Sequence, residues 1–165
     1  MNVQKQATPD YPIHELIAKR WSPYAFSDRP EFERLLSCLV EGNQVWARAA
    51  PVLALGCTSL YFALNGKPNA AAVHDLGIAS ATLTLEATAR GLFVHQMIGF
   101  LPDKARELYR IPDGVRPLTG LAIGYAADPD TLPEKYRERD LAPRTRKRLA
   151  EYVFGGEWGL ASGLV

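Results

Sequence analysis

One stretch of the chain constrains the fold more than any other, namely residues 74–90, HDLGIASATLTLEATAR. Their apolar pattern predicts a helix, and Gly91 directly after it is typical of the residue that follows a helix C-terminus. The helix has little bulk because Gly, Ala, Ser and Thr recur along it. Small side chains let neighbouring elements approach closely. We therefore expect this helix to be central and well buried.

The remaining pattern predicts few strands, alternating irregularly with helices. Helical spacing of apolar residues covers 13–21, 31–49 (with a possible interruption at Gly42–Asn43) and 102–109, and apolar runs predict strands at 52–60, 92–99 and 117–125. This arrangement favours an α+β fold with a small mixed or antiparallel sheet packed between helices. No strand is followed by a dinucleotide-binding fingerprint or a P-loop sequence.

Composition indicates one domain over residues 1–165, with residues 1–10 as a flexible arm. Hydrophobic residues make up 47% of the 165 positions, which is enough for a real core. The 19 Lys and Arg balance the 18 Asp and Glu, which argues against a nucleic-acid or membrane-surface binder. No signal peptide or membrane-spanning run is evident, so we expect a cytoplasmic protein. The two cysteines, Cys38 and Cys57, are interpreted as small buried hydrophobes, and no metal site is expected.

Two groups of cations stand near the ends of the chain, at Arg20 beside Ser22 and at Arg144 and Arg146. Guanidinium groups with a hydroxyl suit a phosphate monoester, although a solvated basic face is the simpler interpretation. His95 lies in a predicted strand, where a structural role is the usual one. No protein nucleophile is evident. The chain therefore has either no chemistry or the chemistry of a bound cofactor.

The segment HQMIGF, residues 95–100, ends a predicted strand with a glycine. A glycine there lets the backbone approach a flat ligand closely, while Gln96 offers an amide and Met97 a polarizable apolar surface. An ordinary core strand that meets a turn is the alternative. The tail from residue 132 is polar and basic and ends in GGEWG, so we expect residues 132–165 to dock on a partner subunit or, equally, to pack on the same chain.

Five segments together resemble the FMN-dependent nitroreductases, in the order found in that family. They are IHELIAKRWSPYAFSDRP, HDLGIASATLTLEATARGL, VHQMIGFLPDKARELYRIPDG, PLTGLAIGYAADPD and LAPRTRKRLAEYVFGGEW. The resemblance implies an intertwined homodimer with FMN at its interface. It also implies reduction of the flavin by NAD(P)H and then of a small electron-poor acceptor, such as a nitroaromatic or a quinone. The flavin would carry the chemistry, with no catalytic side chain.

By position, the resemblance implies flavin contacts in three groups. The N-terminal and C-terminal groups bind the phosphate and ribityl chain, and the strand end lies against the flavin ring, where the backbone N–H of Ile98 faces flavin N5. Asn43 matches a polar residue at the pyrimidine edge. The implied cofactor-binding residues are Arg20, Trp21, Ser22, Asn43, Gln96, Met97, Ile98, Gly99, Arg144 and Arg146.

Two departures from the family pattern keep an alternative open. The family has a cation two residues after the serine of its first motif, where this chain has Tyr24. The family also carries a PS-x-x-N-x-QPW segment, of roughly 30–40 residues by typical element lengths, where this chain passes directly from SDRP to EFERLL. The segment is either deleted and compensated or missing from a longer protein. The alternative function is a catalytically silent nitroreductase-like dimer with weak or no flavin binding. Nucleic-acid binding by residues 135–148 is a third, less favoured hypothesis.

Overall fold

The computed structural model describes residues 30–163. The elements run in the order α2 (Pro30–Leu36), α3 (Glu41–Ala47), β1 (Val52–Ser59), α4 (Ala72–Ala89), β2 (Phe93–Met97), α5 (Pro102–Tyr109), β3 (Val115–Gly124) and α6 (Glu134–Leu141), with short 3₁₀ turns at Pro129–Thr131 and Leu149–Glu151. The predicted helix at 13–21 lies outside the described residues. The predicted α+β class is confirmed.

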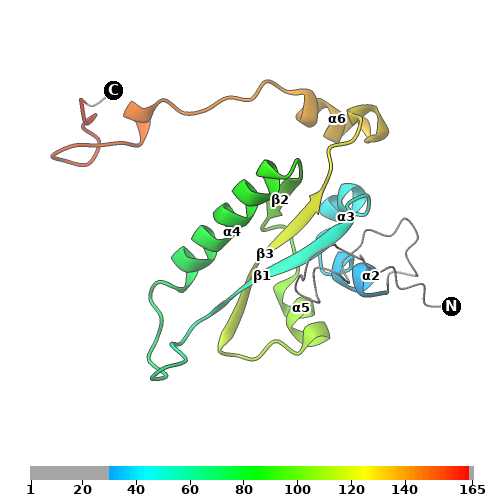
Figure 1. The fold of residues 1–165 in the computed structure, drawn as a ribbon, viewed down its shortest axis with the longest axis horizontal. Coiled ribbons are helices and arrows are strands. Elements are labelled where there is room, and N and C mark those ends of the chain that lie inside the picture. Colours follow the sequence, from blue (N-terminus) through cyan, green and yellow to red (C-terminus); the bar gives the residue numbers. More distant parts are fainter. Residues whose placement is uncertain (1–29, 164–165) are drawn as a thin grey trace, which may run out of the picture.

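The sheet has three antiparallel strands in the order β1-β3-β2, so the last strand in sequence is the central one. Gly120 in β3 pairs with Leu55 of β1 and with Met97 of β2, so the middle of β1 and the C-terminal end of β2 lie level with each other across the central strand. In Figure 1, α4 lies on one face of the sheet and α2, α3 and α5 lie on the other. The strands match the sequence predictions to within two residues at each end.

The core lies on the face covered by α2, α3 and α5. Its buried residues are Leu36, Cys38, Leu39, Ala47, Met97, Phe100, Ala105 and Ala122. Large side chains such as Leu39 and Phe100 fill this layer, and Gly120 faces it, where an added Cβ would lie 3.2 Å from Leu39 Cδ2. This face of the sheet therefore has its own core within one chain, while Phe93 at its edge stays 58% exposed.

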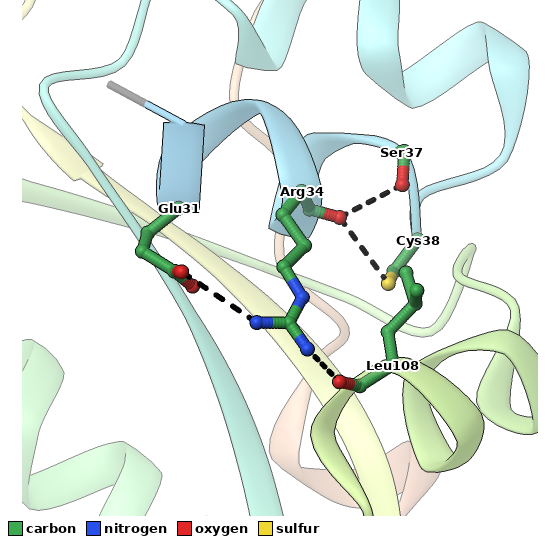
Figure 2. A network of polar contacts seen from close by, with 5 residues as sticks. All are labelled: Glu31, Arg34, Ser37, Cys38 and Leu108. Carbon is green, nitrogen blue, oxygen red and sulfur yellow. Dashed lines mark hydrogen bonds and ion pairs between the residues drawn. The ribbon is translucent and has the colours of Figure 1, made fainter. Parts of the chain in front are cut away.

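The helix pattern predicted for 31–49 is divided in two, and the break falls at residues 37–40 rather than at Gly42–Asn43. Ser37 Oγ and Cys38 Sγ both donate to the carbonyl of Arg34, at 2.8 and 3.5 Å, where α2 ends. The Arg34 guanidinium donates to the carbonyl of Leu108 and pairs with Glu31, so it joins α2 to α5 (Figure 2). Gly42 and Asn43 lie inside α3.

The expectation that α4 is well buried is wrong for a single chain. Only Ala72, Ser80 and Ala87 are buried, at spacings that keep them on the face toward the sheet. Apolar residues elsewhere on the helix are exposed, namely Val73, Ile78, Leu83 and Leu85. The helix ends as predicted at Gly91, which has a φ of +75°. Small side chains thus let α4 approach the sheet, and its outer face has no cover within the described chain.

Two hydrogen-bonded contacts hold α4 against the sheet. Thr58 Oγ1 donates to the carbonyl of Ala72 at 2.7 Å, near the start of the helix. Gln96 Nε2 donates to Thr84 Oγ1 at 2.8 Å and to the carbonyl of Ser80 at 3.2 Å, near its middle. Because donors from both outer strands reach one helix, α4 spans the sheet and fixes β1 and β2 relative to each other.

Candidate functional site

The candidate site lies where β2 ends. Along β2, side chains alternate between the two faces of the sheet, so Gln96 reaches α4 while Met97 enters the core. Met97 is only 7% exposed, whereas the next residue, Ile98, is 85% exposed. Thr119 Oγ1 donates to the carbonyl of Met97 at 3.0 Å and steadies the strand end. The chain therefore changes from core to open surface within one residue.

Gly99 is held in this turn by its own carbonyl group. The carbonyl accepts a hydrogen bond from the backbone N–H of Val40 at 3.1 Å and from Asn43 Nδ2 at 2.8 Å. A Cβ at position 99 would lie 2.4 Å from Asn43 Nδ2, so only glycine fits without movement. The close approach of the backbone that the sequence predicted at Gly99 is thus made to α3, on the side away from solvent.

The backbone N–H of Ile98 makes no hydrogen bond with any residue that the structure describes. It lies between a buried methionine and a glycine fixed by two hydrogen bonds. A free N–H on a rigid turn, beside an exposed backbone, can donate to an acceptor atom on the edge of a flat ligand.

Asn43 is itself positioned by a neighbouring aromatic pair. Trp46 Nε1 donates to Asn43 Oδ1 at 3.3 Å, and the Trp46 ring lies 4.3 Å from the His95 ring, at an angle of 41°. Burial lowers the pKa of His95 below its usual value, and the charge of Asp140 opposes this shift only in part. His95 is therefore neutral at pH 7. The contact between Trp46 and Asn43 was not predicted from the sequence. The two residues lie three positions apart on one helix, and this spacing indicates a shared face.

A cavity of about 460 Å³ opens beside the aromatic pair. Its walls come from α3, from the sheet end formed by Phe93 and Gly124, and from the segment that leads into α6. Tyr136 Oη donates to the carbonyl of Gly42 at 2.6 Å and so ties α6 to α3 across it. Of the described residues predicted to hold flavin, only Asn43 lines this cavity.

The predicted phosphate-binding arginines lie elsewhere. Arg144 and Arg146 are exposed on the extended segment that follows α6, and Figure 1 shows this segment running away from the sheet. Arg146 Nη1 donates only to the neighbouring Thr145 carbonyl, at 2.8 Å, among the described residues. A single chain therefore does not bring these arginines to the end of β2. Arg20, Trp21 and Ser22 lie outside the described residues.

Two further expectations concern the cysteines and metals. Cys38 is buried, as predicted, and burial raises the pKa of its thiol. Cys57 is exposed on β1, so its prediction as a buried residue is wrong; the strand is irregular between Gly56 and Cys57. Residues 30–163 contain no group of three or more His, Cys, Asp or Glu side chains placed to hold a metal ion.

In the described part of the chain, no helix combines the length and the hydropathy needed to cross a membrane.

Known structures share this fold. A crystal structure described as an oxidoreductase containing FMN is 28% identical and has a TM-score of 0.74, with 96% of this chain and 98% of the other matched. A nitroreductase family protein from Clostridium difficile 630 is 24% identical with a TM-score of 0.56, over 80% of this chain and 71% of that one. The class is that of nitroreductase-like α+β proteins, and no family model matches the chain.

Sequence comparison adds a nearer relative. An uncharacterized 15.4 kDa protein of Mycolicibacterium smegmatis, encoded in the ask 5′ region, is 38% identical over 131 residues, which are 78% of this chain and 84% of the relative. The chain belongs to the same family as this uncharacterized relative, and its structural neighbours confirm the nitroreductase-like fold that the sequence resemblance predicted.

Proposed function

We propose that this protein is an FMN-dependent oxidoreductase that passes hydride from NAD(P)H, through the flavin, to an electron-poor acceptor such as a nitroaromatic or a quinone. The observation that carries the proposal is the turn after β2, where the 85% exposed Ile98 has a backbone N–H with no partner among the described residues and the carbonyl of Gly99 accepts a hydrogen bond from Asn43. The similarity along nearly the whole chain to an oxidoreductase described as containing FMN supports it.

The residues present fit a flavin ring at this turn. The fixed carbonyl of Gly99 and the buried Met97 make the backbone a rigid support, and rigidity is what a flat ligand requires of the surface beneath it. Asn43 donates one amide N–H to the carbonyl of Gly99, and its second amide N–H would donate to the pyrimidine edge. Arg144 and Arg146, with Arg20 and Ser22, would supply guanidinium and hydroxyl donors to the phosphate.

The protein's part in the reaction is electrostatic. FMN, when bound, would supply reversible hydride transfer. The N–H of Ile98 would donate to ring N5, and the amide of Asn43 would stabilise negative charge at the pyrimidine edge. No side chain of this chain is required as an acid or a base. NAD(P)H and the acceptor would occupy the same exposed face of the ring in turn.

A homodimer belongs to this proposal. Ile78 and Leu85 lie seven residues apart on the side of α4 opposite its buried residues and are 53% and 71% exposed, and exposed apolar side chains on one helix face are typical of an interface. A partner would also receive the tail: Trp158, near its end, is 93% exposed. Because Arg144 and Arg146 lie on the same extended tail, docking on a partner subunit would carry them toward that subunit's flavin site.

The direct test is the colour and mass of the purified protein. We expect flavin absorbance, bleaching by NAD(P)H without oxygen, return of colour on adding a quinone, and the mass of a dimer. A colourless protein that ignores added FMN would contradict the proposal and favour the catalytically silent relative.

A second test separates flavin retention from turnover. Arg146→Ala should weaken FMN binding by about tenfold or more, because a charge-assisted contact to phosphate is lost, and leave turnover per bound flavin unchanged. Arg116→Ala, which removes an exposed arginine on β3, is the matched control. Equal flavin occupancy in Arg146→Ala and the parent protein would remove Arg146 from the phosphate site.

A further inference from the structure

We propose that the cavity between α3, the Phe93–Gly124 end of the sheet and α6 is a second binding site, which takes a small, uncharged, planar aromatic molecule stacked beside Trp46. This ligand is separate from the flavin of the proposed function, and the inference stands even if the protein binds no flavin.

The size and the walls of the cavity define the ligand. A volume of about 460 Å³ falls in the range of pockets that enclose small organic molecules, roughly 300–1,000 Å³. Five aromatic rings line it, and they belong to Trp46, Phe93, His95, Tyr125 and Tyr136. Aromatic walls favour offset or edge contacts with a flat ring.

The charges on the walls argue against an anionic ligand. Arg139 contributes one positive charge and Asp128 and Asp140 contribute two negative charges, so the rim has a net charge of −1. His95 is neutral, since burial lowers its pKa. A phosphate monoester would find one guanidinium next to a carboxylate here. For this reason the cavity does not fit the phosphate end of FMN, and it fits an uncharged ring.

His95 supplies the polar contact. A neutral imidazole has one donor nitrogen and one acceptor nitrogen. The His95 ring makes no hydrogen bond with residues 30–163, and it lies 4.3 Å from the Trp46 ring. A hydroxyl or carbonyl on a flat ligand can therefore bond to His95 while the ring of the ligand lies against Trp46.

The cavity also has a physical connection to the turn after β2. A ligand there touches Trp46, which donates to Asn43 Oδ1, and Asn43 in turn donates to the carbonyl of Gly99. A ligand in the cavity can therefore influence the position of Asn43, and through it the Gly99 turn, by way of two consecutive hydrogen bonds.

The experiment follows the indole N–H signals of ¹⁵N-labelled full-length protein during titration with 1-naphthol, a flat phenol that is uncharged at pH 7. The Trp46 signal is assigned by its loss in Trp46→Phe. We expect this signal to shift saturably, with a dissociation constant of about 1 mM or tighter, while the Trp158 signal stays in place. Absence of a saturable shift at Trp46 would overturn the proposal.

Matched variants locate the binding. Ala49→Phe places a ring in the cavity from an exposed position on its wall and should weaken binding at least tenfold. Ala63→Phe makes the same change on the exposed loop after β1, outside the cavity, and should leave binding unchanged. His95→Phe keeps an aromatic ring but no hydrogen bond and should weaken binding about three- to tenfold. Equal affinity in Ala49→Phe and the parent protein would overturn the assignment.

A titration with saturating FMN separates this site from the proposed function. We expect 1-naphthol still to saturate the cavity when FMN is present, with an affinity altered only by the coupling through Trp46 and Asn43. Competition between the two ligands would mean that the cavity is part of the flavin site, and the proposal of a second site would fail. A protein that binds 1-naphthol in the cavity but ignores FMN would instead contradict the proposed function alone.

Discussion

The two faces of the sheet differ in the size of the side chains that they bury. The face toward α2, α3 and α5 buries large side chains, among them Leu39, Met97 and Phe100, and these form a core within one chain. The face toward α4 buries Ala72, Ser80 and Ala87, and the far side of that helix leaves Leu85 71% exposed. The comparison teaches that stability and assembly are separated in space. The layer formed by α2, α3 and α5 stabilises the single chain, whereas the outer side of α4 is exposed and can pack against a second chain.

The largest expected effect comes from a substitution in the core under α2, α3 and α5. Leu39 is 2% exposed at the centre of the core, so Leu39→Ala should lower the free energy of unfolding by about 2–5 kcal/mol. Urea denaturation followed by circular dichroism measures the change. The control is Leu64→Ala, on a loop residue that is almost fully exposed. It should change the free energy of unfolding by less than about 0.5 kcal/mol, as is usual for surface substitutions. A loss below 1 kcal/mol for Leu39→Ala would mean that this layer is not the stabilising one.

The next effect concerns the open face. If α4 packs on a second copy of the chain, Leu85→Glu buries an unpaired charge and should raise the dimer dissociation constant about a hundredfold or more. Sedimentation over a range of protein concentrations measures it. Leu64→Glu places the same charge on the exposed loop and should leave the mass unchanged. A dimer that survives Leu85→Glu with equal affinity would place the interface away from this residue.

A smaller effect sharpens the description of the turn after β2. Gly99→Ala drives a Cβ to within 2.4 Å of Asn43 Nδ2 and should destabilise the protein by about 1–3 kcal/mol. Asn43→Ala in the same chain removes the obstructing atom, so the double variant should lose less than the sum of the two single variants. Thermal unfolding of the four proteins completes the cycle. Additive losses would show that the two residues act independently.

The smallest effect depends on pH. Burial holds the pKa of His95 below the value of 6.5 that applies in an unfolded chain. The unfolded state therefore binds more protons as the pH falls below about 6.5, and the folded state loses stability until the lowered pKa is passed. His95→Phe should lose less stability than the parent protein between pH 7 and pH 5, in urea melts at each pH. Parallel pH profiles would mean that His95 titrates normally.

The sequence predicted the regular elements well where a local pattern defined them. The strands at 52–59 and 115–124 follow apolar runs, and α5 follows Pro102, a residue that fits the first turn of a helix. The end of α4 at Gly91 was predicted for the same kind of local reason. The break between α2 and α3 was missed because it depends on side chains that bond to the Arg34 carbonyl and on the contact with α5.

The site was only partly predictable, since its parts act over long sequence distances. The position of Gly99 follows from the strand end, but its hydrogen bond to Asn43 joins residues 56 positions apart. The helix α6 was missed because residues 134–141 are almost all polar, and its anchor is one tyrosine hydroxyl on Gly42. The arginines at 144 and 146 resemble the family motif in sequence, yet both are exposed on the segment after α6, where Arg146 donates only to the Thr145 carbonyl among the described residues. Tertiary pairing and assembly, which no local pattern encodes, decide these features.

The order of strands in the sheet has a consequence for how the chain is made. β1 and β2 are synthesised first but do not touch each other, because β3 lies between them. Neither can gain its sheet partner until residues 115–124 have left the ribosome, so the nascent chain carries β1 unpaired while residues 60–114 are made, and β2 with it after residue 97. During that interval the growing chain is at its most vulnerable to aggregation, and its unpaired strands are the segments that a chaperone would bind.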